Sequence, residues 1–116
     1  MKTINLAEKL AQFSSHWDPH VVADYNGNDV MVVKFQGEFP FHVPPDTDDF
    51  FLVLEGEMEM ELEGQSHTVK AGEIFIVPKG VTHRPRAENE CKVLLIEPIG
   101  EPNSGDPETA TLKPHI

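Results

Sequence analysis

Three side chains in the sequence carry the groups that most often bind a transition metal in a protein: His42, Asp49 and His83. A neutral imidazole is a common metal ligand, and a nearby carboxylate supplies an anionic oxygen. Two histidines and one carboxylate that leave coordination positions open form the ligand set of non-haem Fe(II) sites. His42 and His83 are far apart in the sequence, so the prediction depends on a fold that brings them together.

The first of these residues lies in the stretch "FPFHVPPDTDDFFLVLEGEM", residues 39–58. Residues two apart on a strand face the same way, so His42 and Pro44 both project inward if this segment is extended. Pro44 fixes its own φ and removes a backbone donor, which reshapes the strand that leaves His42. The "PDTDD" segment is interpreted as a hydrophilic turn. Asp46 and Asp48 are substitute carboxylates for a metal if this turn bends toward the site.

Short strands must position these groups. From residue 20 onward the apolar residues recur with a period of two, which is typical of strands. Asn26-Gly27 lies between two such runs and is a strong hairpin signal, because both residues tolerate positive φ. Many short strands at regular spacing favour a sandwich or a small barrel. The expected strands are Val21–Tyr25, Asp29–Phe35, Phe50–Leu54, Glu57–Leu62, His67–Val69, Ile74–Val77 and Val93–Glu97.

A short helix is expected before the strands. Asn5 can cap its start, and Glu8 stands three residues on, in a variant of the capping box. The apolar residues that share one helical face are Leu6, Leu10, Phe13 and Trp17. We therefore expect an N-terminal helical arm at 1–19, one β-barrel domain at 20–98 and an irregular tail at 99–116. The tail is rich in Pro, Gly and small polar residues, which bury too little surface to order themselves.

Composition excludes several classes of partner. The 116 residues suit one domain, and 20 acidic against 9 basic residues give a formal net charge of −11. Nucleic acid and anionic membrane surfaces need clustered Lys and Arg, so neither is an expected partner. No apolar run approaches the ~20 residues of a membrane span. Cys91 is the single cysteine, which fits a reducing compartment, and we expect a cytoplasmic location.

The order of glycine, proline and histidine around the candidate ligands resembles the cupin superfamily, whose two motifs read G-x5-H-x-H-x3,4-E-x6-G and G-x5-P-x-G-x2-H-x3-N. Residues Gly37, His42 and Gly56 stand in the order of the first motif, and Gly72, Pro78, Gly80 and His83 stand at the spacing of the second. The resemblance is close to small single-domain cupins of the Cupin 2 type and runs to about residue 100. It implies an all-β fold, an antiparallel jelly-roll barrel of six to eight strands, commonly dimeric, with a pocket inside.

The sequence departs from the ligand pattern of cupins that bind metal. The second histidine position of the first motif is Pro44, which has no donor atom, and the glutamate position is Asp49, shorter by about 1.5 Å. The final asparagine position of the second motif is Ala87. Carried over residue by residue, the resemblance implies a site formed by His42, Asp49 and His83 for Fe, Mn, Ni or Zn. A working site and a weak or vestigial one are both open.

Three functions remain open. The first is a metal-dependent enzyme of oxygenase or isomerase type, in which the metal acts as a Lewis acid or activates O₂. The second is a non-catalytic, small-molecule-binding cupin with a degenerate or empty metal site. The third is a metal-free isomerase or epimerase with His83 or His42 as general base. Whether the protein is an enzyme stays open as well, because a fold does not establish a function.

The expected partners are a small-molecule ligand and a second copy of the chain. We place Pro44, Asp48 and Arg84 in the pocket or at its rim. Arg84 and Arg86 share one face and are candidates for pairing with acids across a dimer or for holding an anionic ligand. The runs "FFLVLEG" and "EIFIVPKG" are apolar at consecutive positions, so both faces of these strands must be covered. The N-terminal helix and a second subunit are the available covers, and a homodimer is expected.

Overall fold

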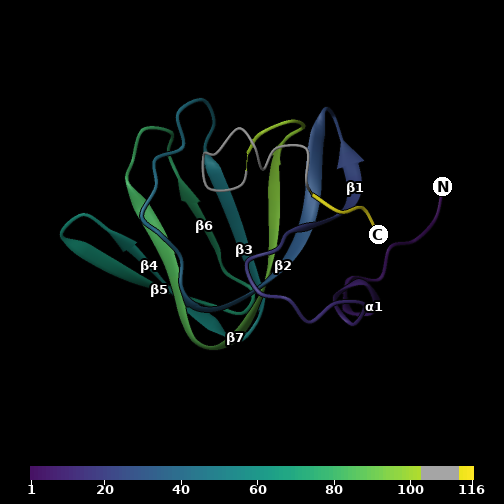
Figure 1. The fold of residues 1–116 in the computed structure, drawn as a ribbon, viewed down its shortest axis with the longest axis horizontal. Coiled ribbons are helices and arrows are strands. Elements are labelled where there is room, and N and C mark those ends of the chain that lie inside the picture. The colour runs from purple at the N-terminus through teal and green to yellow at the C-terminus, as the bar shows by residue number, and fades with distance from the viewer. Residues whose placement is uncertain (103–112) are drawn as a thin grey trace.

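A computed structural model describes residues 1–102 and 113–116, in which one short helix precedes seven strands (Figure 1). The helix α1 spans Leu6–Leu10. The strands are β1 His20–Tyr25, β2 Asn28–Glu38, β3 Asp49–Glu55, β4 Glu57–Leu62, β5 Gln65–Lys70, β6 Ile74–Val77 and β7 His83–Pro98. Of the tail predicted at 99–116, residues 103–112 lie outside the described part of the chain.

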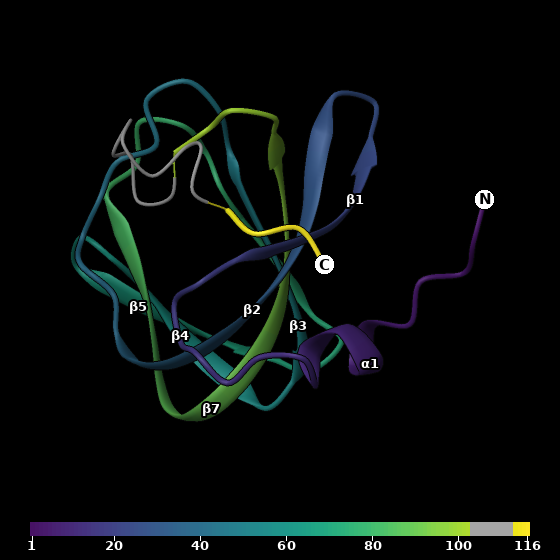
Figure 2. The ribbon, with the colours of Figure 1, turned by 45° about the vertical axis from the view of Figure 1, so that its right-hand side comes forward.

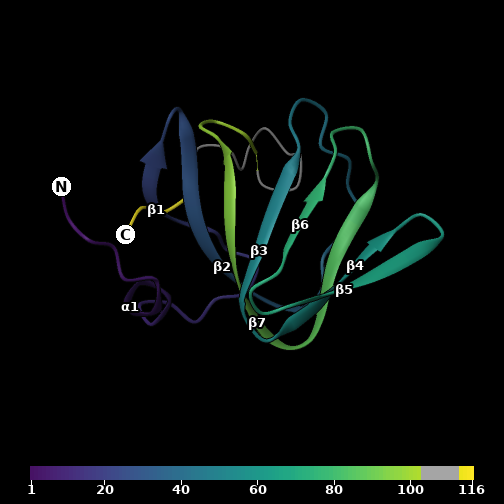
Figure 3. The same ribbon diagram turned by 180° about the vertical axis from the view of Figure 1, so that it is seen from behind.

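The strands form one antiparallel sheet that curls around the core, as the front and back views show (Figures 1 and 3). The main order is β1-β2-β7-β3-β6, and the β4–β5 hairpin is attached through β4 to β7. The first residues of β7 pair with β4, and its later residues lie between β2 and β3. The sheet curls without closing. The prediction of an all-β, antiparallel jelly-roll fold with a short N-terminal helix is therefore confirmed.

The alternation of side chains along β3 and β7 decides which groups face the interior. Phe51 of β3 and Leu95 of β7 are buried in the core. Residues two apart on a strand share a face, so Asp49 lies on the inner face of β3 and Glu97 on that of β7. Two carboxyl groups therefore stand at the ends of rows that are otherwise apolar.

Two local predictions near the N-terminus are confirmed. Asn26 and Gly27 have φ values of 49° and 78°, so both adopt the left-handed conformation expected of the hairpin turn between β1 and β2. Asn5 caps α1, because its Oδ1 accepts a hydrogen bond of 3.0 Å from the backbone N–H of Glu8.

The predicted helical face is wrong beyond Leu10, where α1 ends. Trp17 has a φ of 58°, which no helix accommodates. Its indole Nε1–H donates to the carbonyl of Gln36 at 2.9 Å, and its ring stacks on Phe35 with centroids 4.4 Å apart. These tertiary contacts replace the helical spacing, and the arm runs along the sheet as an irregular segment.

The chain returns to β1 at its C-terminus (Figure 2). The backbone N–H of Val21 donates to the carbonyl of Pro114 at 2.8 Å, and the N–H of Ile116 donates to the carbonyl of Val21 at 2.9 Å. Within the described residues, no helix has the length and apolar character that crossing a membrane requires.

Candidate functional site

Two segments meet on the inner side of the sheet, and each brings one histidine. His42 and His83 form an isolated antiparallel bridge, in which each backbone N–H donates to the carbonyl of the other at 3.0 Å. The centroids of their imidazole rings are 4.4 Å apart. His83 is the first residue of β7, so the start of the last strand fixes the position of a histidine in a distant loop.

Asp49, the first residue of β3, completes the cluster. Its Oδ2 lies 2.8 Å from Nε2 of His83 and 3.4 Å from Nε2 of His42. One ligand atom from each residue falls within 4.8 Å of the others, so the three groups are close enough together to be candidates for holding one metal ion. His83 is fully buried, and Asp49 is 8% exposed. The fold thus brings the three candidate ligands together.

Hydrogen bonds to the backbone set the tautomers of both rings. Nδ1 of His42 lies 3.0 Å from the carbonyl oxygen of Pro40, and Nδ1 of His83 lies 2.9 Å from that of Val81. A carbonyl oxygen can only accept, so each Nδ1 carries a proton and Nε2 of the neutral ring keeps its lone pair free to bind a metal. Metal-bound histidines typically show this arrangement.

The surroundings of the buried Nε2 of His83 indicate whether a cation fits the cluster. This atom has no hydrogen-bond partner, because Asp49 Oδ2, although only 2.8 Å away, lies outside hydrogen-bond geometry. A buried polar atom without a partner costs about 1–3 kcal/mol. A cation between two imidazole lone pairs and a carboxylate would satisfy all three groups, so the residues present fit a divalent metal.

The charges within the cluster stabilise one another. Burial lowers the pKa of His42, but hydrogen bonds to Asp49 and Pro40 and the charges of Asp49 and Glu97 outweigh it, so the pKa is raised. Burial raises the pKa of Asp49, but the interaction with His42, the close approach of His83 and the charges of both rings outweigh it, so that pKa is lowered. Asp49 is therefore ionised at neutral pH and places a negative charge between the rings.

The loop between the first two candidate ligands is tied to the turn that precedes the third. The backbone N–H of Gly80 donates to the carbonyl of Pro44 at 2.8 Å, and that of Lys79 donates to Oδ1 of Asp48 at 2.9 Å. Pro44 is buried and lines the adjacent cavity, whereas Asp48 is exposed and is absent from its lining. Of these two residues that the sequence placed at the pocket, Pro44 contacts the cavity and Asp48 holds the turn.

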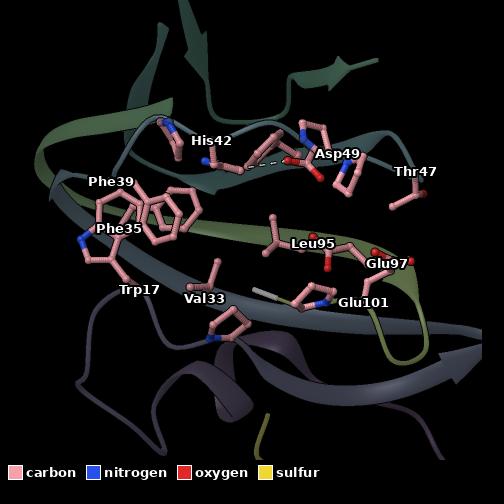
Figure 4. Close-up of a pocket in the computed structure, with 16 residues that line it drawn as sticks. Trp17, Val33, Phe35, Phe39, His42, Thr47, Asp49, Leu95, Glu97 and Glu101 are labelled. Atoms are coloured by element: carbon pink, nitrogen blue, oxygen red, sulfur yellow. Dashed lines mark ion pairs between the residues drawn. The ribbon is translucent and has the colours of Figure 1, made fainter. Parts of the chain in front are cut away.

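A cavity with an aromatic end and an acidic end lies beside the cluster (Figure 4). It encloses about 610 Å³ of atom-free space, mouth included, of which about 50 Å³ can hold the centre of a water molecule. That is room for a few waters or a small ligand group. The aromatic lining comprises Trp17, Phe35, Phe39 and Phe51, and the titratable lining comprises His42, Asp49, Glu97 and Glu101.

Sequence reasoning missed Glu97, which it treated only as the end of a strand. The available signal was its spacing of two from Leu95, which places both side chains on the inner face of β7. The carboxyl group lies 3.4 Å from Nζ of Lys113, and its side chain is 16% exposed. Burial raises the pKa of Glu97 to about 7, with the positive charge of Lys113 opposing this rise and the negative charge of Asp49 adding to it.

Arg84, which the sequence placed at the rim, pairs with acids of its own chain. Its Nε lies 2.9 Å from Oε2 of Glu61, and its Nη1 lies 3.0 Å from Oε2 of Glu38. Arg86 donates to the other oxygen of Glu61. Neither arginine lines the cavity beside the cluster, so both guanidinium groups have intramolecular partners outside it.

Comparison with known proteins places the chain in a family. The family model described as the cupin domain matches residues 29–97. A cupin-2 domain containing protein from Shewanella frigidimarina NCIMB 400 is 43% identical, with a TM-score of 0.81 over 83% of this chain and 94% of that one. The uncharacterized protein YdbB of Bacillus subtilis is 36% identical over 91 residues, which is 78% of this chain and 74% of YdbB. Quercetin 2,3-dioxygenase of the same organism is 35% identical over 51 residues, 44% of this chain but 15% of that enzyme.

The matched region contains β3 to β6, nearly all of β2 and β7, and all three candidate ligands. The sequence similarity, the fold and the motif positions agree, and we conclude that the chain belongs to the cupin superfamily and has a domain of the Cupin 2 type.

Proposed function

We propose that this cupin binds a small molecule in its cavity beside a divalent transition metal held by His42, Asp49 and His83. The observation that most supports this proposal is the buried Nε2 of His83, which has no hydrogen-bond partner and lies 2.8 Å from Asp49. The Nδ1–H groups of both rings are directed at backbone carbonyls, as in most metal-bound histidines. Two histidines and one carboxylate suit Fe, Mn, Ni or Zn.

The metal, its ligands and the aromatic residues of the cavity would have different roles. When bound, the metal would supply Lewis-acid or O₂-activating chemistry of the oxygenase or isomerase type. His42 and Asp49 both line the cavity, so a molecule in the cavity lies against the ligand set. Trp17 and Phe39, whose ring centroids are 5.1 Å apart, form an apolar wall that excludes water and offers ring faces.

The lining favours a small, uncharged, partly planar molecule. Its aromatic end would pack against rings, and the acids Asp49, Glu97 and Glu101 disfavour anionic ligands. The local similarity to quercetin 2,3-dioxygenase supports oxygenase chemistry, although it covers less than half of this chain. We therefore favour an oxygenase or isomerase reaction on a small neutral compound.

A non-catalytic binding cupin is the second candidate. Pro44 stands where the first cupin motif has its second histidine, and it lines the cavity without a donor atom. A site with one ligand fewer holds a metal less tightly. In this second candidate the cavity binds a small molecule, and the metal site is degenerate.

Elemental analysis of protein purified without a metal-chelating tag tests the metal proposal. We expect close to one metal per chain in the unaltered protein and loss of that metal in Asp49→Asn, which keeps the side-chain shape, and in His83→Ala. His67→Ala is the matched control, because His67 is an exposed histidine of β5, and it should retain the metal. Circular dichroism confirms that each variant is folded.

The variant Pro44→His separates the two candidate functions. It adds an imidazole at a buried position that lines the cavity, so a weak site should gain metal affinity, whereas Val43→His, at an exposed neighbouring position outside the cavity lining, should not. Metal found only in Pro44→His would support the degenerate site. Metal in none of these proteins would contradict the metal proposal. A binding protein without metal or a metal-free acid–base catalyst would then remain.

We also propose that the protein is a homodimer formed through the outer face of the sheet. The register places two apolar rows across four strands: Val30, Ile96, Phe50 and Ile76 in one, and Val32, Leu94, Leu52 and Ile74 in the other. Ile74 and Ile76 are 56% and 51% exposed, whereas Val32, at the opposite end of its row, is already buried within the chain. Among the described strands, β6 pairs only with β3. A twofold axis over this face would bring apolar rows against identical rows, which makes the surface complementary to itself.

A further inference from the structure

Part of the cavity wall comes from outside the region that the cupin model matches. Trp17 and Pro19 both line the cavity, whereas the matched region begins at residue 29. These two residues belong to the irregular arm between α1 and β1. The cupin sheet thus supplies the candidate metal ligands, and the arm adds a tryptophan that the shared family features do not specify.

Several contacts hold Trp17 in an unfavourable backbone conformation. Its φ of 58° is rare for a bulky residue. Its backbone N–H donates to the carbonyl of Lys34 at 2.9 Å, and Nζ of Lys34 donates to the carbonyl of Phe13 at 2.6 Å. With the indole bond to Gln36, these contacts fix the arm on β2. Strained residues that their surroundings hold in place cluster at functional sites and ligand clamps, so the strain points to a binding role for this ring.

A row of rings leads from Trp17 to the candidate metal site. The ring centroids of Trp17 and Phe39 are 5.1 Å apart, and those of Phe39 and His42 are 5.3 Å apart. Figure 4 shows Trp17, Phe35 and Phe39 grouped at one end of the cavity. Trp17 and Phe39 are only partly buried, and both line the cavity. A planar molecule packed against these two rings therefore lies within about one ring of His42.

The size and charge of the cavity narrow the class of ligand. The cavity accommodates about three to five water molecules, which together occupy about the volume of one six-membered ring. Aromatic rings in offset or edge-to-face contact gain more than their buried area accounts for, so an aromatic ring is favoured over a saturated one. The acids of the other end, Asp49, Glu97 and Glu101, disfavour an anionic substituent.

We propose that Trp17 is the specificity-determining residue of this cavity, and that it selects a neutral compound with a single aromatic ring. The proposal rests on the proposed function and names the substrate class of the same site. The ring of the ligand packs against Trp17 and Phe39, and a polar substituent on that ring reaches toward His42 and Asp49.

The first measurement compares an aromatic ligand with its saturated counterpart. Benzyl alcohol and cyclohexylmethanol, which are similar in size, are titrated separately into the metal-free full chain, and ligand-observed NMR gives both affinities. Benzyl alcohol should bind about two- to tenfold more tightly, as an aromatic pair contributes. Trp17 is the only tryptophan of the chain, so bound benzyl alcohol should also shift the tryptophan emission and protect it from quenching by acrylamide.

Two substitutions at position 17 isolate the contribution of the ring. Trp17→Phe and Trp17→Leu both remove the indole N–H that donates to Gln36, but only Trp17→Phe keeps an aromatic ring. The preference for benzyl alcohol should persist in Trp17→Phe and be lost in Trp17→Leu. Phe41→Leu is the matched control and should keep the preference, because Phe41 is 50% exposed and does not line the cavity. Circular dichroism confirms that each variant is folded.

The outcomes separate this proposal from the metal site. Equal affinities for the two alcohols, binding of neither, or a preference that survives in Trp17→Leu would overturn the proposal. Binding of benzyl alcohol that leaves the emission and quenching of Trp17 unchanged would also overturn it, and this readout needs no variant. Zn²⁺ binding by the unaltered protein is measured separately by calorimetry. Failure to bind Zn²⁺ would contradict the proposed metal site, whereas the ring preference is decided by the metal-free titrations.

Discussion

At the scale of single residues, two substitutions relative to the cupin pattern have different consequences. Asp49 replaces a longer glutamate, yet its Oδ2 lies 2.8 Å and 3.4 Å from the two Nε2 atoms. It reaches them because it begins β3 at the point where the preceding loop is tied to the turn before His83. Pro44 stands at the position of the second histidine and has no donor atom, and only its backbone carbonyl makes a contact, accepting a hydrogen bond from Gly80. The shorter acid therefore keeps its place in the cluster, whereas the proline does not.

Glu97 should make the stability of the protein depend on pH. Its pKa is raised to about 7 in the folded protein from an ordinary value of 4.5. The folded state therefore holds a proton that the unfolded state releases between these values, so stability falls as pH rises from 4.5 to 7 and is constant above. The loss is about 3 kcal/mol at most. Urea denaturation at several pH values should show this decline in the unaltered protein and a shallower one in Glu97→Gln.

The difference in stability between the unaltered protein and Glu97→Gln isolates the contribution of Glu97, because the other titrating residues are common to both proteins. The stability of Glu97→Gln relative to the unaltered protein should rise between pH 4.5 and 7.5. Parallel curves over that range would show that Glu97 titrates alike in the folded and unfolded states, which would contradict the prediction.

At the scale of elements, β7 positions both ends of the site. It begins at His83 and ends at Pro98, so it carries a candidate ligand at its start and Glu97 near its end. The sequence predicted only Val93–Glu97 as a strand here. Pro85 and the exposed residues 88–90 interrupt the apolar alternation, and the pairing of this part with β4 and β2 keeps it extended. Strand pairing decided the length of β7.

The turn between β3 and β4 depends on glycine. Gly56 has a φ of 83°, and a Cβ there would lie 3.0 Å from the carbonyl oxygen of Glu90. Gly64, in the β4–β5 turn, has a φ of 77° and nothing within 4 Å of such a Cβ. Gly64→Ala should cost about 1–2 kcal/mol for the left-handed backbone. Gly56→Ala should cost about 1–3 kcal/mol more because of the contact with Glu90.

Urea denaturation of both alanine variants measures this difference. Equal losses in the two variants would mean that the backbone of β7 moves away freely, and that Gly56 is required only for its conformation. A larger loss in Gly56→Ala is the expected result.

At the scale of the whole molecule, the outer face of the sheet determines the assembly. Ile76→Glu would place a charge in the centre of an apolar interface, where an unpaired charge is costly. Sedimentation equilibrium should find a dimer for the unaltered protein and a monomer for this variant. Its metal content should be unchanged, because Ile76 points away from the cavity.

Tyr25→Glu is the control, since Tyr25 is 59% exposed at the β1–β2 hairpin, outside the two rows. It should remain dimeric. A monomeric unaltered protein, or a dimer that persists in Ile76→Glu at the same concentration, would contradict the proposed interface.

Much of the fold could be predicted from local patterns. Alternation identified the strands, Asn26-Gly27 identified the hairpin, and Asn5 identified the start of the helix, because these signals depend on neighbouring residues alone. The helix end could not be predicted, since Trp17 takes its conformation from contacts with Phe35 and Gln36. Local propensity is overridden where a large aromatic ring finds a tertiary partner.

The sequence by itself determined the family and the three candidate ligands, because residue type and motif spacing are written in the chain. Only the tertiary structure decided that Nε2 of His83 is buried without a partner and that Arg84 pairs with Glu61 and Glu38. It also placed Glu97 in the cavity. Burial and contact distances depend on strands that are far apart in sequence, so no local pattern specifies them.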